Sequence, residues 1–243
     1  MKIFMAFIIG LLLMLPQVSS AEIFQQPVAS KGCVILLHGL ARSASSFEKM
    51  EASLSQVGYR VINVDYPSRK ASVETLANRY VSKAVAECRG DTIHFVTHSM
   101  GGILVRYYLA NNRPDNLGRV VMLSPPSQGS EVVDKLGDVP GFYALNGPAG
   151  QQLGTADDSL PNRLGPVDYP VGIITGNRSI NLILSLLIPG DDDGKVSIER
   201  AKLAGMTDFL VVPHTHPMIM DSDEVIRQTR YFLLNGRFDG ASK

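Results

Sequence analysis

A single serine stands where the sequence predicts a sharp turn between a strand and a helix. Ser99 follows the apolar run 93–96 and precedes a helical pattern that begins at Met100. A serine hydroxyl is a weak nucleophile at neutral pH, so it needs a nearby base and backbone N–H groups that receive an oxyanion. A strand-to-helix elbow holds the hydroxyl clear of the backbone and meets both needs. Ser99 is therefore the candidate nucleophile.

The residues that flank Ser99 are those that such a turn requires, with one departure. The turn crowds the chain, so its usual pattern is Gly-x-Ser-x-Gly. Gly101 keeps the second glycine, whereas the β-branched Thr97 replaces the first. The alternative is a serine that caps a helix with a glycine packed inside it. Four features elsewhere in the chain favour the nucleophile.

The first feature is a buried-strand run that begins at Cys33 and ends in His38-Gly39-Leu40, followed by small and polar residues. A glycine-bearing loop after such a strand can turn a backbone N–H toward the nucleophile. By position, the N–H groups of Leu40 and Met100 are expected to form the oxyanion hole. The alternative is an ordinary strand-ending turn, and His38 is expected to be structural in either case.

The second and third features are a carboxylate and an imidazole late in the chain. Three aspartates, 191–193, follow the predicted strand 171–175, and two histidines, His214 and His216, follow the β-rich run 208–213. A histidine just past a terminal strand can turn its ring toward the serine. A carboxylate past the preceding strand can then hold the other ring nitrogen and stabilise the imidazolium.

Asp193 and His216 are the preferred acid and base. His216 lies farther past its strand than the other histidine, and Pro217 restricts the loop that holds it. Two other interpretations of the aspartates stay open, a solvated charged turn and a Ca²⁺-binding loop, because hard cations bind clustered carboxylate oxygens. His94 and His98 are interpreted as packing residues or local supports.

The fourth feature is a strand, 120–124, that passes into a Pro/Gly loop beside the predicted site. Taken together, the motifs resemble those of bacterial secreted lipase-like or carboxylesterase-like serine hydrolases of the alpha/beta-hydrolase superfamily. The resemblance covers most of residues 31–236. It is carried by Leu37-His38-Gly39-Leu40, Thr97-His98-Ser99-Met100-Gly101-Gly102, Pro126-Ser127-Gln128-Gly129-Ser130, the turn Asp193-Gly194-x-Val196, and His216.

This resemblance implies an α/β fold in which a mostly parallel sheet has helices on both faces. It also implies a Ser-His-Asp mechanism on carboxylic ester bonds, without a cofactor or a metal, and a small-molecule acyl ester or lipid as substrate. The superfamily also contains thioesterases, acyltransferases and proteins without catalysis, so these reactions and a lipid or protein binder stay open. Peripheral contact with a membrane and the oligomeric state stay open as well.

Alternating strand and helix patterns agree with a parallel sheet covered by helices. The predicted strands are 34–37, 60–64, 93–96, 120–124, 171–175 and 209–212, and the predicted helices are 73–88, 100–112 and 224–235. Two segments keep alternatives. Residues 137–170 form either a partial cap over the serine or a surface connection. The apolar run 180–188 either lines an acyl pocket or belongs to the core.

Composition fits one enzyme domain and argues against a nucleic-acid binder. The chain has 243 residues, of which 45% are hydrophobic, and it shows neither repeats nor low-complexity tracts. Residues 22–243 are therefore expected to form a single domain. The formal net charge is zero, so nucleic acid is not an expected partner.

The first 21 residues are expected to lie outside that domain. Lys2 precedes the apolar run 3–15, and small residues at 19–21 supply a cleavage site before Glu22. This pattern is typical of a secretory signal peptide and predicts a secreted or periplasmic location. The alternative is an uncleaved anchor, although the run is shorter than the ~20 residues that span a bilayer.

The expected export of the protein matters for its two cysteines, because disulfides persist in oxidising compartments. Cys33 opens the first core strand, and Cys88 closes the predicted helix 73–88. In the alpha/beta-hydrolase fold the strands 34–37 and 93–96 are neighbours, which places both cysteines at the end of the sheet opposite the serine. A Cys33–Cys88 disulfide is therefore expected, with two buried free thiols as the alternative.

Overall fold

Six parallel strands form the centre of the protein. The computed structural model describes residues 31–240, apart from the side chain of Leu182, so the predicted signal peptide lies outside it. The strands are β1 (Cys33–Leu37), β2 (Arg60–Val64), β3 (Ile93–His98), β4 (Leu117–Leu123), β5 (Val171–Gly176) and β6 (Asp208–Val212). Their order is β2-β1-β3-β4-β5-β6. β3 lies between β1 and β4, so the expected pairing of strands 34–37 and 93–96 is confirmed, and the strand that contains 120–123 pairs with the other side of β3.

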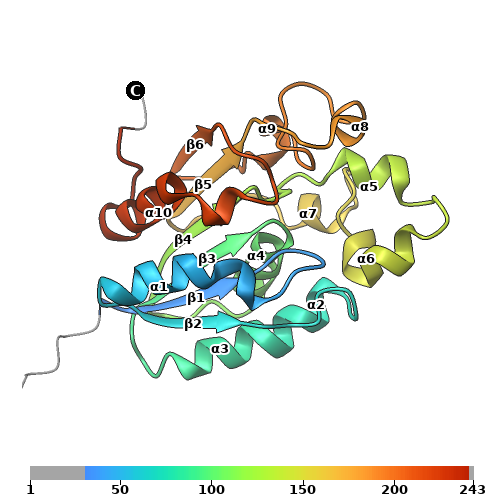
Figure 1. Cartoon of the computed structure of the whole chain (residues 1–243). Coiled ribbons are helices and arrows are strands. Elements are labelled where there is room, and N and C mark those ends of the chain that lie inside the picture. Colours follow the sequence, from blue (N-terminus) through green and yellow to red (C-terminus); the bar gives the residue numbers. More distant parts are fainter. Residues whose placement is uncertain (1–30, 241–243) are drawn as a thin grey trace, which may run out of the picture.

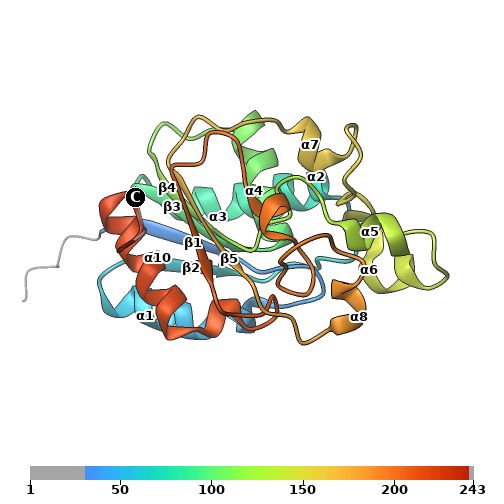
Figure 2. The same cartoon turned by 90° about the horizontal axis from the view of Figure 1, so that it is seen from above.

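Helices cover both faces of this sheet. The 3-10 helices are η1 (Ala44–Phe47) and η3 (Ile219–Asp221), the π-helical turn is η2 (Ala77–Val81), and the α-helices are α1 (Glu48–Gln56), α2 (Val73–Leu76), α3 (Ser82–Glu87), α4 (Met100–Asn111), α5 (Glu131–Leu136), α6 (Phe142–Gln151), α7 (Leu160–Arg163), α8 (Leu182–Ser185), α9 (Ile198–Ala201) and α10 (Asp223–Asn235). Figures 1 and 2 show α1 and α10 on one face, with α2, α3 and α4 on the other. The predicted α/β fold class is confirmed.

Burial follows from these layers. The strands β1, β3 and β5 are buried along their whole length, as expected for central parallel strands with both faces covered. The edge strand β2 is only half-buried. Ile35 and Phe95 pack in the cluster beneath α2, α3 and α4, whereas Leu36 and Val96 pack in the cluster beneath α1 and α10. The alternation of side chains along each strand therefore fills two cores.

Several short helices gather beyond the carboxyl ends of the strands. Figures 1 and 2 show α5, α6 and α8 at this end of the sheet. Residues 137–170 contain α6 and α7, which the sequence pattern does not predict. In the run 180–188 the core alternative is wrong for Ile180, Ile183 and Leu186, which are 74%, 77% and 86% exposed. Across residues 31–240, no helix is long and apolar enough to cross a membrane.

The opposite end of the sheet holds the cysteine pair. Cys33 and Cys88 form a disulfide with their Cα atoms 5.6 Å apart, and both residues are buried. The predicted pairing is confirmed, and the alternative of two free thiols is wrong.

A buried histidine near this end should make stability depend on pH. His94 on β3 accepts a hydrogen bond from the backbone N–H of Arg119 through Nδ1, at 2.9 Å, which a protonated ring cannot do. Burial, together with the charge of Arg119, lowers the pKa of His94 from 6.5 to about 4. The unfolded chain therefore binds the proton more readily, and stability is lost as the pH falls from 6.5 toward 4.

At about 1.4 kcal/mol per pH unit, the low pKa of His94 is expected to reduce the free energy of unfolding by about 2 kcal/mol between pH 6.5 and pH 5. Urea unfolding of the wild type and of His94→Asn at pH 7.5 and pH 5 measures this contribution. Asparagine can still accept the bond from Arg119, so the variant should lose about 2 kcal/mol less than the wild type over this interval. Equal losses in the two proteins would contradict the assignment.

Candidate active site

Ser99 occupies a strained turn between β3 and α4. Its φ of 53° and ψ of −124° lie in a region that residues with a side chain rarely adopt. The backbone N–H of Ser99 is anchored to the carbonyl oxygen of Leu123 at 2.8 Å. A Cβ on Gly101 would collide with the carbonyl oxygens of Leu37 and His38. The elbow geometry therefore requires glycine at position 101.

Thr97, the departure from the usual elbow pattern, fits because of the second glycine after the serine. Thr97 is fully buried on β3 and pairs with Leu37 and Met122 of the adjacent strands. A Cβ on Gly102 would stand 3.2 Å from Cβ of Pro125 and 3.4 Å from the Thr97 hydroxyl. Gly102 thus leaves the space into which the threonine side chain extends.

His216 and Asp193 form a hydrogen-bonded pair. The His216 Nδ1 and Asp193 Oδ2 atoms are 2.8 Å apart, and the other carboxylate oxygen accepts bonds from the N–H groups of Lys195 and Val196. Burial alone would raise the pKa of the Asp193 carboxyl, but the charge of His216 and its hydrogen bond outweigh burial and lower that pKa. Asp193 is therefore held as a carboxylate against the imidazole.

Ser99 faces the same cavity as this pair. Ser99, Asp193 and His216 all line a cavity of about 240 Å³. Within the described chain, no hydrogen bond joins the Ser99 hydroxyl to the His216 ring. Such bonds are often long in an enzyme without substrate and shorten when the substrate binds. Three segments far apart in sequence thus bring a hydroxyl, an imidazole and a carboxylate to one hollow.

The neighbouring candidates have other partners. The Asp192 carboxylate accepts bonds from the Ser185 hydroxyl at 2.8 Å and from the backbone of the same turn. His214 contacts the Ser222 hydroxyl at 2.8 Å, at the start of α10. Neither Asp192 nor His214 lines the cavity. Among residues 31–240, no group of three or more His, Cys, Asp or Glu side chains is placed to hold a metal ion.

The two N–H groups predicted for the oxyanion hole lie beside the elbow. Met100 is the first residue of α4, so its N–H has no acceptor inside the helix. The N–H of Leu40 has no acceptor among the described residues, and Leu40 lines the cavity. A Cβ on Gly39 would stand 3.1 Å from Cβ of Ser99, so the glycine lets this loop approach the serine closely.

His38 supports that loop from behind. Its ring stacks on Tyr66 with the centroids 4.1 Å apart, and its Nδ1 contacts the carbonyl oxygen of Gly39 at 2.8 Å. The N–H of Tyr66 donates to the other ring nitrogen, and the Tyr66 hydroxyl donates to the His38 carbonyl oxygen. Burial lowers the pKa of His38, which favours the neutral ring that these contacts need.

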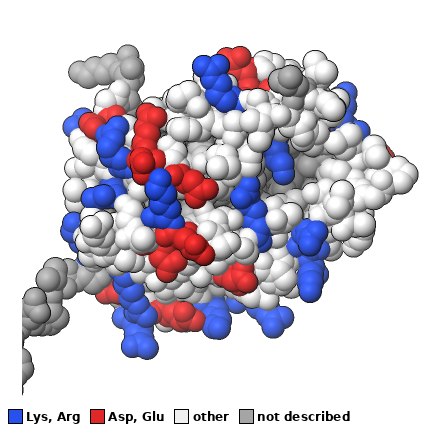
Figure 3. Space-filling view, viewed as in Figure 1, with Lys and Arg blue, Asp and Glu red and all other residues white. Residues whose placement is uncertain are grey.

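Apolar side chains form most of the cavity wall. They come from the Leu40 loop, from the loop before α5, from α5, from α6 and α8 with the residues next to them, and from the turn of Asp193, and they include Leu40, Pro126, Val132, Val133, Phe142, Leu153, Ile180, Leu184 and Val196. Both segments that the sequence leaves open, 137–170 and 180–188, contribute to this wall. Figure 3 shows the surface hollowed beside the lobe that α5 and α6 form.

The match to known sequences agrees with this arrangement. The sequence matches the alpha/beta hydrolase fold family over residues 32–166, more than half of the chain. The chain belongs to the alpha/beta hydrolase fold family. No curated protein matches this chain at a significant level.

Solved structures with the same fold include several bacterial or metagenomic enzymes. The mature lipase BlEst2 of Bacillus licheniformis has a TM-score of 0.66 at 20% identity, over 87% of this chain and 94% of the lipase. The metagenomic carboxyl esterase MGS0156 has a TM-score of 0.64 at 21% identity, over 86% and 75%. A thermophilic esterase from Thermogutta terrifontis gives 0.57 at 15%, over 85% and 91%. At such identities the likeness concerns the fold.

In this alpha/beta hydrolase, His98 supports the backbone of His216. The sequence predicts this role only in part. Its Nε2 lies 3.0 Å from the carbonyl oxygen of His216, and the two rings are 4.7 Å apart. Burial, together with the charge of His216, holds the pKa of His98 well below 6.5. A neutral His98 therefore donates to the His216 backbone. The prediction of a local support is incomplete, because the partner lies 118 residues away.

Sequence reasoning missed Arg106 altogether. This arginine is buried on α4 and donates to the carbonyl oxygens of Ser127, Pro161 and Gly165. Burial lowers its pKa to about 10, so it stays charged. Arg106 ties the loop after β4 to the segment around α7. Its one signal in the sequence is a lone arginine inside an otherwise apolar helical pattern.

Proposed function

We propose that this hydrolase cleaves carboxylic esters through Ser99, His216 and Asp193. The observation that carries the proposal is the buried His216–Asp193 pair, which shares one apolar cavity with a serine in a strained elbow. Backbone strain of the kind seen at Ser99 clusters at active sites. The lipase and esterase names of the structural neighbours agree with this chemistry.

In the proposed reaction, His216 accepts the Ser99 proton at Nε2 while the serine oxygen attacks the ester carbonyl. Asp193 holds Nδ1–H and stabilises the imidazolium that forms. The N–H groups of Leu40 and Met100 donate to the oxyanion, and the helix α4 directs its positive end toward the same place. His216 then protonates the leaving alcohol, and a water molecule that it activates releases the acyl group from Ser99.

The apolar cavity wall supports the proposal that the cavity binds the acyl group of the substrate. Its side chains include Phe142 on α6 and Leu184 on α8, and burying apolar area there favours a hydrocarbon chain. Ile183 and Leu186 on and beside α8 are largely exposed. They support the further proposal that this end of the protein makes peripheral contact with lipid.

Covalent labelling tests the proposed function. A fluorophosphonate probe should react with the folded protein, and peptide mapping by mass spectrometry should place the adduct on Ser99. Ser130 lines the same cavity, but its hydroxyl donates to the Lys195 carbonyl oxygen, so it should stay unmodified. Denatured protein is the control and should give no adduct. A folded protein that remains unlabelled would instead favour a non-catalytic binder.

We also propose that residues 22–243 form the mature domain, secreted or periplasmic. The Cys33–Cys88 disulfide supports this location, since disulfides persist in oxidising compartments. The same peptide map tests it, because a chain processed in its native host should begin at Glu22. A map that contains residues 1–21 would contradict the cleavage.

A further inference from the structure

Two basic side chains line the cavity of Ser99 and have no part in the proposed reaction. Arg42 follows the loop that carries Leu40, and Lys195 follows Asp193 in its turn. Across the described chain, neither has a carboxylate within ion-pair distance. Asp193 is the one acidic residue in the cavity wall, and His216 and two N–H groups already engage its oxygens. The two cations are therefore available to a ligand.

Arg42 is bonded to the loop that carries His216. Its Nη2 donates to the carbonyl oxygen of Pro217 at 2.9 Å, and Pro217 directly follows His216. In the proposed reaction His216 gives its proton to the leaving alcohol, so that alcohol must lie beside the His216 ring. Arg42 is thus held next to the alcohol part of the substrate.

Lys195 shares this region with Arg42. Lys195 is an exposed residue; partial desolvation of its ammonium group and the charge of Arg42 lower its pKa, and the charge of Asp193 opposes them. The charges of Arg42 and Lys195 also lower the pKa of His98, which lines the same cavity. Like charges held close together repel each other, and an anion between them would relieve that repulsion.

The positive region continues beyond the cavity. Arg42 also lines an adjoining hollow together with Arg69 and Lys70, and that hollow has no acidic residue in its wall. Figure 3 shows basic side chains around the hollowed part of this face. Other residues of the cavity wall are apolar and include Val133 and Phe142. The site thus offers both hydrocarbon contacts and positive charge.

We propose that Arg42 and Lys195 form an anion subsite, and that the substrate is an acyl ester whose alcohol carries a phosphate group. The proposal rests on the proposed function and adds the substrate class to it. A phosphate suits this pair because a guanidinium can bond two of its oxygens while the ammonium group acts as a point charge. An acyl chain in the apolar part would then leave the phosphate between the two cations.

A matched pair of substrates tests the subsite. Butyrylglycerol phosphate and butyrylglycerol differ only by the phosphate, and both dissolve as monomers, so no lipid surface is involved. We expect kcat/KM to be about ten- to a hundredfold higher for the phosphate ester, the effect of one charge-assisted hydrogen bond. Glycerol phosphate should inhibit competitively, and glycerol should not. If inorganic phosphate inhibits as strongly as glycerol phosphate, the ligand is free phosphate and the substrate assignment is wrong.

Variants that each remove one positive charge test which residues cause the preference for the phosphate ester. Arg42→Gln and Lys195→Gln should each lower the ratio of kcat/KM for the two substrates about tenfold. The ratio cancels any general loss of activity, such as one from releasing Pro217. Lys83→Gln removes an exposed charge on α3 that pairs with Glu87, and it should keep the wild-type ratio.

The outcomes separate this proposal from the proposed function. Equal kcat/KM for the two esters, or a ratio that neither cavity variant changes, would overturn the anion subsite while leaving the ester hydrolase in place. Failure to hydrolyse either ester, together with no labelling of Ser99, would overturn both.

Discussion

Asp193→Asn is expected to lower kcat for a nitrophenyl ester about 10⁴-fold while the fold is retained. The asparagine oxygen can still accept the N–H bonds of Lys195 and Val196, which now go to the Asp193 carboxylate. Its amide group then faces the His216 ring as a donor. Nδ1 must become the acceptor, the ring proton moves to Nε2, and the nitrogen that should accept the Ser99 proton is no longer free.

Asp192→Asn is the matched control for this prediction. It replaces the adjacent aspartate in the same turn, whose oxygen accepts from Ser185 and Gly194 and does not contact His216. An amide oxygen can accept both of those bonds, so kcat should stay within a few fold of the wild type. Equal thermal unfolding curves would show that both variants are folded. If Asp193→Asn retained more than a tenth of the wild-type kcat, Asp193 would not be the acid of the triad.

The strands could be predicted because each carries its own signal. The run 60–64 is predicted with the bounds of β2, and the elbow strand differs only in extending to His98. Central parallel strands read as continuous apolar runs because both of their faces are covered. The helix α1 was missed because only Met50 and Leu54 among its nine residues are buried, which is too thin a stripe to mark a helix.

The lobe that α5 and α6 form beside the cavity was also harder to predict, because its helices carry weak sequence signals. The helix α6 has a break at Gly147, whose φ is 65°, and Pro148 follows it. A sequence rich in glycine and proline predicts loops, and here tertiary contacts hold two short helical pieces together. For Leu186 the residue type misleads in the opposite direction. An apolar side chain usually indicates burial, but that of Leu186 is exposed.

For the site, the sequence indicates residues whose positions follow from the ends of strands. Ser99, Asp193 and His216 each follow a strand, and parallel strands end at one edge of the sheet. Contacts between remote segments leave no such pattern in the sequence. The bond from Arg42 to Pro217 joins residues 175 positions apart, so no local pattern could place that charge beside His216. The proposed anion subsite therefore comes from the structure alone.

Removing the disulfide is expected to lower the free energy of unfolding by about 4 kcal/mol. Cys33 and Cys88 are 55 residues apart, and in the chain-entropy view a bridge across a loop of this length restricts the unfolded chain by about that amount. Urea unfolding of the wild type and of the double variant Cys33→Ala/Cys88→Ala measures the change. A loss below about 1 kcal/mol would mean that the bridge contributes little to folding.

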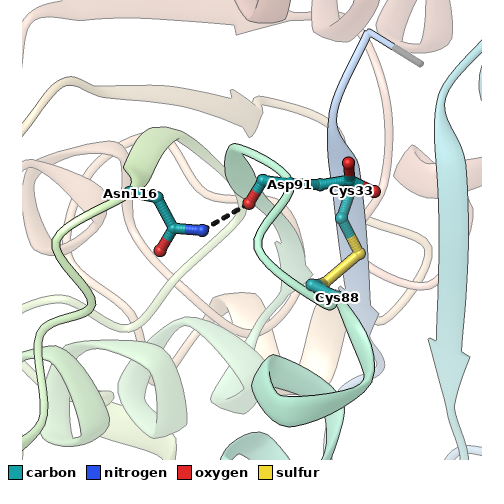
Figure 4. Close-up of a disulfide and its surroundings, with 4 residues drawn as sticks. All are labelled: Cys33, Cys88, Asp91 and Asn116. Carbon is teal, nitrogen blue, oxygen red and sulfur yellow. Dashed lines mark hydrogen bonds between the residues drawn. A yellow bond between two sulfur atoms is a disulfide. The ribbon is translucent and has the colours of Figure 1, made fainter. Parts of the chain in front are cut away.

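Reduction of the wild type separates the crosslink from the packing of the two sulfur atoms. Dithiothreitol opens the bridge but leaves both sulfurs in the core, so it should reproduce most of the loss seen in the double variant, on which it should have no effect. Figure 4 shows the bridge between β1 and the end of α3, next to a turn where Asn116 donates to the Asp91 carbonyl oxygen. Because this end of the sheet is opposite Ser99, kcat should stay within about twofold in folded protein, as expected when a crosslink acts mainly on the unfolded chain.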